Sequence, residues 1–219
     1  MDRITDAFAW PARDPEWPAK LMVTGLILLI PIVGSINGLG WMLASLDRLR
    51  AGENTLAPAN LRYIGRGFQL FVVDLAYYLV VAGIAAAVYV PALIVATSQS
   101  NGSANAALIS LAIALSLLAF SLATLGSLAL NFVMPSIVLA TDRGGIGGGL
   151  RVRSVLRHAR ANMANTLIAG LMLIAAGFIG SLGLVACGIG VLFTTAYALA
   201  MQAWVVRSFE IGSPAATAA

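Results

Sequence analysis

The feature of this sequence that most constrains its fold is a run of 44 residues, 163–206, that contains no charged side chain. It is bracketed by Arg160 and Arg207. A helix that crosses a bilayer needs about 20 apolar residues, so this run is twice too long for one crossing and long enough for two. Glycines gather near its middle, where a tight turn can form: Gly177, Gly180, Gly183, Gly188 and Gly190. The run therefore predicts a membrane helical hairpin whose ends lie on the same side of the bilayer.

The rest of the chain has the same apolar character. Hydrophobic residues make up 60% of it and charged residues 10%, against about 25% charged residues in a soluble domain. A net charge of +4 would suit nucleic acid, but the basic residues fall in the gaps and at the ends of the apolar runs, where they set orientation and contact anionic headgroups. We therefore expect one membrane domain over residues 1–219, with anionic lipid headgroups as partners and no nucleic acid.

The N-terminal quarter contains two predicted elements. Residues 1–19 carry three prolines together with Trp10 and Trp17, and predict an interfacial segment whose indole rings suit the headgroup zone. Residues 21–46 are uncharged but interrupted by Pro31 and by glycines. This run is too short for two crossings, and basic residues flank both of its ends, which disfavours a single crossing. It predicts a broken, re-entrant hairpin that bends between residues 31 and 40, with a single kinked span as the alternative.

Two long spans and a cationic helix are predicted in the middle of the chain. Residues 68–96 and 104–140 form the spans, separated by a polar stretch that lacks Lys and Arg. Between residues 47 and 67 lies a polar connector in which Pro58 predicts the start of a short surface helix. Glycines 144–149 predict a flexible lead into an amphipathic helix over 147–162, with arginines opposite an apolar face that consists of Val152, Val155, Leu156, Ala159 and Met163.

Together these elements predict an all-α polytopic integral membrane helical bundle. It has about four full spans plus the N-terminal re-entrant or kinked hairpin, and amphipathic interfacial helices. The positive-inside tendency predicts a multi-pass protein with both termini on the cytoplasmic side. Residues 98–103 and the turn near Cys187 are then expected outside.

The N-terminal pattern resembles a known family. It carries Asp14-Pro15 and Trp17, then Leu29-Ile30-Pro31-Ile32-Val33-Gly34, and a basic exit at Arg48-Leu49-Arg50. This pattern, over roughly residues 4–75, resembles a prokaryotic multi-pass membrane family catalogued as domain of unknown function four-zero-one-three. The resemblance implies placement in a prokaryotic cytoplasmic (inner) membrane, and it implies no activity. The sequence departs from the family at residues 56–61, where the family usually carries an acidic, tryptophan-containing stretch.

Few residues offer chemistry. Asn37, Asp74 and Asn131 are the intramembrane polar candidates, and we expect Asp74 to snorkel or to pair with Arg66. His158 is the sole histidine, and it has no Cys or acidic cluster at ligand spacing, so neither a metal nor another cofactor is expected. Four arginines are candidates for binding lipid headgroups: Arg151, Arg153, Arg157 and Arg160.

Small-residue faces and aromatic anchors are plentiful in this sequence, whereas catalytic constellations are absent from it. We therefore expect a non-enzymatic membrane scaffold or accessory subunit that packs against other membrane proteins or against itself. The alternative is a small solute or ion transporter or channel-like protein, which the broken hairpin and a weak similarity between residues 26–44 and 182–200 would favour. A lipid-handling role of the arginine helix is a third possibility.

Overall fold

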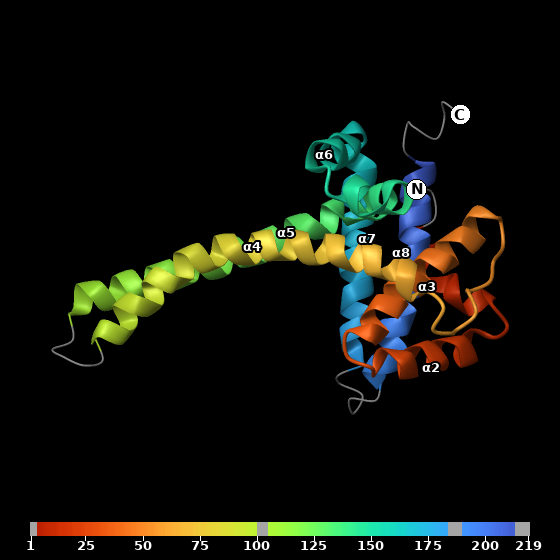
Figure 1. Cartoon of the computed structure of the whole chain (residues 1–219), viewed down its shortest axis with the longest axis horizontal. Helices are drawn as coiled ribbons and strands as arrows, with labels where there is room; N and C mark the ends of the chain where they lie inside the picture. The colour runs from red at the N-terminus through yellow and green to blue at the C-terminus, as the bar shows by residue number, and fades with distance from the viewer. Residues whose placement is uncertain (1–3, 100–104, 184–189, 213–219) are drawn as a thin grey trace. The chain divides into compact units, whose positions relative to one another are not determined.

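A computed structural model describes residues 4–99, 105–183 and 190–212. Within these ranges the chain is helical apart from short connections and contains no strand, which confirms the all-α prediction. The elements, shown in Figure 1, are α1 (Ile4–Ala9), the short 3-10 helix η1 (Pro11–Arg13), α2 (Trp17–Leu28), α3 (Val33–Arg50), α4 (Ile64–Gln99), α5 (Ala106–Gly149), α6 (Val152–Ala161), α7 (Met163–Leu182) and α8 (Gly190–Ile211).

Packing divides the chain into two compact units. The first comprises Met1–Val73 and Asn131–Ala219, and the second is Asp74–Leu130. The first unit therefore contains every helix except the greater part of α4 and the first half of α5. All the clusters and the cavity described below lie in this first unit.

Helix α8 is the centre of the first unit, because α7, α3, α2 and α1 all pack against it. Small residues let α7 and α8 approach closely: Ala176 packs against Ala198 and Met201, and the Thr194 hydroxyl donates to the Gly180 carbonyl at 2.8 Å. The two helices lie side by side in Figure 1 and form the hairpin that the charge-free run predicts. The turn at Cys187, and with it part of the weak similarity at 182–200, lies outside the described residues.

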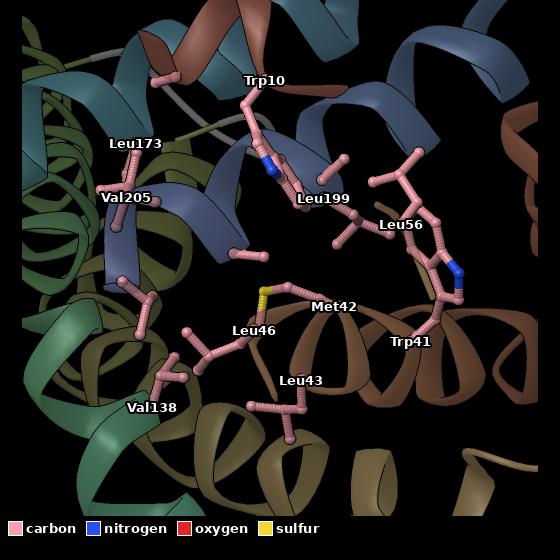
Figure 2. Close-up of a cluster of buried hydrophobic side chains, with 14 of the residues drawn as sticks. Trp10, Trp41, Met42, Leu43, Leu46, Leu56, Val138, Leu173, Leu199 and Val205 are labelled. Atoms are coloured by element: carbon pink, nitrogen blue, oxygen red, sulfur yellow. The ribbon is translucent and has the colours of Figure 1, made fainter. Parts of the chain in front are cut away.

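The N-terminal segment contributes to this core. Figure 2 shows the Trp10 ring among side chains of α3, α7 and α8. Only 1% of Trp10 is exposed. Trp17 packs against Phe193 and Tyr197, with ring centroids 5.7 and 6.4 Å apart. The expectation that both rings suit the headgroup zone is thus wrong for Trp10, because a break after α1 turns the segment onto α8. The interfacial position of residues 1–19 as a whole stays a prediction.

The uncharged run 21–46 forms two helices that are separated at Pro31. Helix α2 ends at Leu28 and α3 begins at Val33. Between them Ile32 has φ 63° and ψ −59°, and the Val33 N–H donates to the Pro31 carbonyl at 2.6 Å. These values define a γ-turn, a strained three-residue reversal. The break lies where the sequence predicts a bend, whereas entry of this pair of helices into a bilayer stays a prediction.

Two local predictions are wrong. No helix starts at Pro58: residues 51–63 are irregular, and α4 begins at Ile64. The glycines at 144–149 are not a flexible lead either, since they continue α5 through a break at Gly145, where φ is 60°. The cationic helix α6 is consequently shorter than the predicted 147–162.

Three of the described helices are long and apolar enough to cross a membrane, namely α4 over Ile64–Ser98, α5 over Ala106–Gly149 and α7 over Met163–Leu182. Helix α8, the second arm of the predicted hairpin, is largely enclosed by protein and carries Thr194, Thr195 and Gln202. The count of four full spans therefore stays a prediction.

Candidate functional site

Charged residues from four helix ends meet in the first unit. The end of α3 supplies Asp47 and Arg50, and the first turn of α4 supplies Arg66. The C-terminal parts of α5 and α8 supply two residues each. Apolar runs place their charges at their ends, so bundling these helices brings the charges together. We call this group the arginine–carboxylate cluster; it consists of Asp47, Arg50, Arg66, Asp142, Arg143, Arg207 and Glu210.

Arg50 is the hub of the cluster. Its Nε and Nη2 donate to Glu210 Oε2 and Oε1, each at 3.0 Å, in a fork-to-fork pair. Its Nη1 donates to Asp142 Oδ2 at 2.6 Å and to Asp47 Oδ1 at 3.1 Å. One planar guanidinium therefore ties α3 to both α5 and α8, which a lysine ammonium has no geometry to do.

Arg66 completes the link to α4. Its Nη2 donates to Asp142 Oδ1 at 2.6 Å, and its Nη1 pairs with Asp47 Oδ2. Asp142 is thus held between two arginines, and only 5% of its side chain is exposed. On the opposite flank Arg143 and Arg207 donate to Glu210 at 2.9 and 3.0 Å.

The pKa values of the cluster's carboxylates fit a structural ion-pair network rather than an acid–base centre. Burial alone would raise the pKa of Glu210, but hydrogen bonds from Arg50 and Arg143 outweigh it and hold that pKa at about 2. The pKa of Asp47 is likewise lowered, because its bonds to Arg66 and Arg50 outweigh burial. Both carboxylates therefore stay ionised at neutral pH, and four arginines facing three carboxylates leave one positive charge in excess.

A second set of polar bonds fixes the connector between α3 and α4. Asn37, Trp41 and Ser45 are spaced four residues apart and so share one face of α3. Asn37 Nδ2 donates to the Asn60 carbonyl and Trp41 Nε1 to the Ala57 carbonyl, both at 2.9 Å. Ser45 Oγ accepts from the Ala57 N–H at 3.2 Å. These side chains satisfy the connector's backbone, and this explains why it stays irregular without an energetic penalty.

The N-terminal segment is attached to the same connector. Asp14 is 2% exposed and accepts from the Leu56 N–H at 2.7 Å and from Lys20 Nζ at 2.8 Å. Burial alone would raise the pKa of Asp14, but its bonds to Lys20 and to two backbone N–H groups lower it below its usual value. Asp14 therefore serves as a buried anchor between the segment before α2 and the chain after α3.

The three intramembrane polar candidates differ in their hydrogen bonding and burial. The side chain of Asn37 bonds the connector: besides its bond to Asn60, its Oδ1 accepts from the Tyr63 N–H at 3.3 Å. Asp74 does not pair with Arg66, because Arg66 binds Asp47 and Asp142; Asp74 Oδ1 has no hydrogen-bond partner among the described residues. Asn131 is half-buried on α5.

The arginines of α6 lie on its outer side. Val155 and Ala159 are buried against the bundle, whereas the candidate arginines are exposed: Arg151, Arg153, Arg157 and Arg160. Val152 and Leu156 belong to the predicted apolar face but are exposed as well. Helix α6 therefore presents both cations and apolar side chains outward, as helices that lie in a membrane interface do.

A cavity of about 190 Å³ lies between α5 and α6. Its lining includes Ser136, Leu139 and Arg143 of α5 and Ser154, Val155 and His158 of α6. The His158 ring also meets Phe209 edge-on, with centroids 5.7 Å apart. Burial and the nearby charge of Arg143 lower the pKa of His158 below its usual value. In the described ranges no three His, Cys, Asp or Glu side chains are grouped so that they could hold a metal ion.

Sequence reasoning missed both the cluster and this cavity. A usable signal was present for the cluster: an acid lies within three residues of an arginine at the ends of three apolar runs, at Asp47/Arg50, Asp142/Arg143 and Arg207/Glu210. The partners themselves could not be read from the sequence, since Arg50 and Glu210 are 160 residues apart.

A bundle of helices in which three are apolar and long enough to cross a bilayer defines a helical membrane protein. The chain belongs to the DUF4013 family, whose description is "Protein of unknown function" and whose profile matches residues 23–189. This match confirms the family resemblance and extends it well beyond residue 75, although residues 4–22 lie outside it. No curated protein and no solved structure matches the chain.

Proposed function

We propose that this protein is a non-enzymatic membrane scaffold or accessory subunit, and that its α4–α5 hairpin packs against other membrane proteins. The observation that carries this proposal is the exposure of that hairpin. Within the second unit α4 and α5 pack on each other, for instance where Gly126 meets Val81. Large apolar side chains nevertheless remain uncovered along both helices: Leu79, Val80, Ile84, Ile94, Ile113, Leu117, Phe120 and Leu125.

The distribution of polar groups supports the same proposal. The charged residues of the first unit hold helix ends together, and the polar face of α3 holds the connector, so neither is left to line a path for a solute. A transporter needs polar groups that converge near the bilayer midplane. Asn37, the polar residue nearest the α2–α3 break, already bonds Asn60 and Tyr63.

We further propose that the protein lies in a prokaryotic cytoplasmic membrane with the arginine–carboxylate cluster on the cytoplasmic side. The positive-inside tendency supports this orientation, because the cluster and α6 together hold most of the basic residues. If α4 and α5 each cross the membrane once, Arg66 and Asp142 lie on the same side of it, as their ion pair requires. Anionic headgroups of the same leaflet are the expected lipid partners of α6.

Site-specific photo-crosslinking in intact cells tests the scaffold proposal. A photoreactive residue is placed at Leu79, Leu117 or Phe120 on the hairpin, and at Phe178 on α7 as a control that is equally exposed, at 65% against 72% for Phe120. We expect discrete protein adducts of defined mass from the hairpin positions and lipid adducts from Phe178. Lipid adducts alone at all four positions would contradict the proposal.

A flux assay on the purified chain in vesicles separates the alternative. If the protein is a scaffold, solute and ion flux into these vesicles should equal the flux into vesicles without protein. Flux above that background that is lost in the Asn37→Ala or Asp74→Asn variant would contradict the scaffold proposal and show that the protein is a transporter.

A further inference from the structure

The cavity between α5 and α6 is lined by several polar residues, and the hydroxyl of one of them, Ser136, has no hydrogen-bond partner among the described residues. Ser136, Arg143, Ser154 and His158 are among the residues that line the cavity. Its volume of about 190 Å³ equals the space of roughly six water molecules at ~30 Å³ each. A tetrahedral oxyanion fits within such a volume.

Ser136 is the most telling member of this group. It is only 1% exposed, and its hydroxyl has no hydrogen-bond partner among the described residues. Other serines of the same helix behave differently: Ser110, Ser116 and Ser121 each donate to the carbonyl four residues earlier at 2.8 Å. A buried hydroxyl with no hydrogen-bond partner raises the free energy of the folded state. An acceptor bound in the cavity would remove this cost.

Arg143 supplies the charge. Among the described residues only Glu210 accepts from it, through Nη2 at 2.9 Å, so its other N–H groups remain able to donate to an anion. Glu210 is at the same time neutralised by Arg50 and Arg207. The positive charge that the arginine–carboxylate cluster has in excess is therefore available at Arg143, its most exposed arginine.

We propose that this cavity is a binding site for a phosphate group, in which Arg143 pairs with the anion and Ser136, Ser154 and His158 hydrogen-bond its oxygens. Phosphate offers several acceptors in a tetrahedral array, which matches one guanidinium and converging hydroxyls. Exposed arginines and apolar side chains of α6 border the site, so the phosphate can come from a lipid headgroup or from a free phosphate ion. The inference does not depend on the scaffold proposal.

The sole histidine of the chain makes the site observable. His158 lines the cavity together with Arg143 of α5, its ring meets Phe209 of α8, and its own helix carries Arg157 and Arg160. The imidazole resonances of the tag-free, full-length protein are recorded against pH in maltoside micelles, which contain no phosphate. Inorganic phosphate is added in one arm, and phosphatidic acid in the other, with phosphatidylcholine as its neutral counterpart.

We expect a saturable change of the His158 resonances and a rise of its pKa by about one unit, since a neighbouring anion favours the charged imidazole. The response to phosphatidic acid alone assigns the site to a lipid, the response to inorganic phosphate alone assigns it to a free ion, and both support a phosphate site. Ser136→Ala and Arg143→Gln should each weaken binding at least fivefold. Ser110→Ala and Arg153→Gln, matched in residue type but outside the cavity, should leave it unchanged.

No response in either arm would overturn the proposal. So would a response of equal strength in wild type, Ser136→Ala and Arg143→Gln. Because Arg143→Gln also weakens a bond to Glu210, Ser136→Ala is the decisive variant: it removes one hydroxyl that has no partner among the described residues and leaves the cluster intact.

Discussion

Arg50 donates to three carboxylates that lie in three different helices, so this single side chain links α3 to α5 and α8. Its fork to Glu210 and its bond to Asp142 are largely buried. Removing one partner from a buried ion pair costs about 3–5 kcal/mol, because the other charge is left uncompensated. Arg50→Lys keeps the charge but loses the fork, so we regard the planar shape of arginine as the property that matters here.

Glu210 gives this cluster a pH dependence. Its pKa in the folded chain is about 2, below its usual 4.5. A carboxyl whose pKa is depressed by folding contributes stability that is complete above the unfolded pKa and is lost as pH falls toward the folded pKa. We therefore expect the unfolding midpoint of the detergent-solubilised protein to fall as pH decreases from about 5 to about 2, with a loss of roughly 2–3 kcal/mol.

The variant Glu210→Gln isolates that contribution. It should unfold at a lower temperature than wild type at pH 7 and should show a flatter pH profile below pH 5. Glu53→Gln, an exposed carboxylate in the connector, is the matched control and should keep the wild-type profile. A wild-type profile for Glu210→Gln would contradict the geometry of the cluster.

At the scale of single residues the sequence predicts where charge lies but not what it contacts. The positions of the arginines follow from the ends of the apolar runs, and the structure keeps them there. Asn37 was predicted as an intramembrane polar group, yet it bonds a connector that is 23 residues further along the chain. A hydropathy profile reports only how apolar the sequence neighbours of a residue are. It therefore cannot distinguish a polar side chain that bonds distant backbone groups from one that has a functional role.

At the scale of elements, α3 and the start of α4 approach each other through glycine. A Cβ at Gly67 would collide with the Ile36 carbonyl oxygen of α3, and one at Gly40 would collide with the Tyr63 carbonyl. Both obstacles are backbone atoms, which cannot rotate out of the way. The positions of the helices were predictable from hydrophobic runs, whereas this crossing depends on two hydrogen-sized side chains in different elements.

Gly67→Ala should therefore destabilise the protein by about 1–3 kcal/mol or more, as overpacking does. Gly65→Ala, two residues earlier in α4, meets no atom within 4 Å. It should be neutral or stabilising by up to ~1 kcal/mol, since alanine is the better helix former. Unfolding midpoints of the two variants in the same detergent measure the difference, and equal midpoints would exclude the close approach.

The γ-turn between α2 and α3 stores strain at Ile32. A β-branched residue at φ 63° costs about 1–3 kcal/mol, whereas glycine adopts positive φ freely. Because the Ile32 side chain is 65% exposed, Ile32→Gly should stabilise the protein by about 1 kcal/mol. The φ of Ile30 is not positive, so glycine relieves no strain there, and Ile30→Gly should instead lower the unfolding midpoint. A loss of stability in both variants would show that the turn is not strained.

Sequence reasoning located this break at Pro31 but predicted a short helix at Pro58 that does not form. Both prolines restrict their backbone in the same way. The difference is that the carbonyls and N–H groups around Pro58 are bonded by Asp14, Trp41 and Ser45. An irregular segment whose backbone is satisfied by side chains gains nothing by becoming helical.

At the scale of the whole molecule, the cluster fixes which helix ends belong together. The end of α3, the start of α4, the end of α5 and the end of α8 share ion pairs, so all four must lie at one membrane face if the long helices cross a bilayer. Parity alone suggests this arrangement, and the ion pairs add a physical reason for it.

Cysteine labelling tests the proposed orientation. In a Cys187→Ser background, Asn54→Cys lies in the exposed connector and Ser98→Cys at the exposed far end of α4. An impermeant maleimide should label Ser98→Cys in intact cells and Asn54→Cys only after the membrane is opened. The reverse pattern would place the cluster outside, and labelling of both in intact cells would mean that α4 does not cross.

The arginine–carboxylate cluster also has an order in time. A ribosome releases Arg50, Arg66 and Arg143 well before Glu210, which is 67 residues beyond Arg143. Until α8 has been made and inserted, these three cations share only Asp47 and Asp142. A nascent chain that stops short of its last helix thus leaves Arg143 without its carboxylate partner and Arg50 without its fork-to-fork pair, and both arginines gain these bonds only when Glu210 arrives.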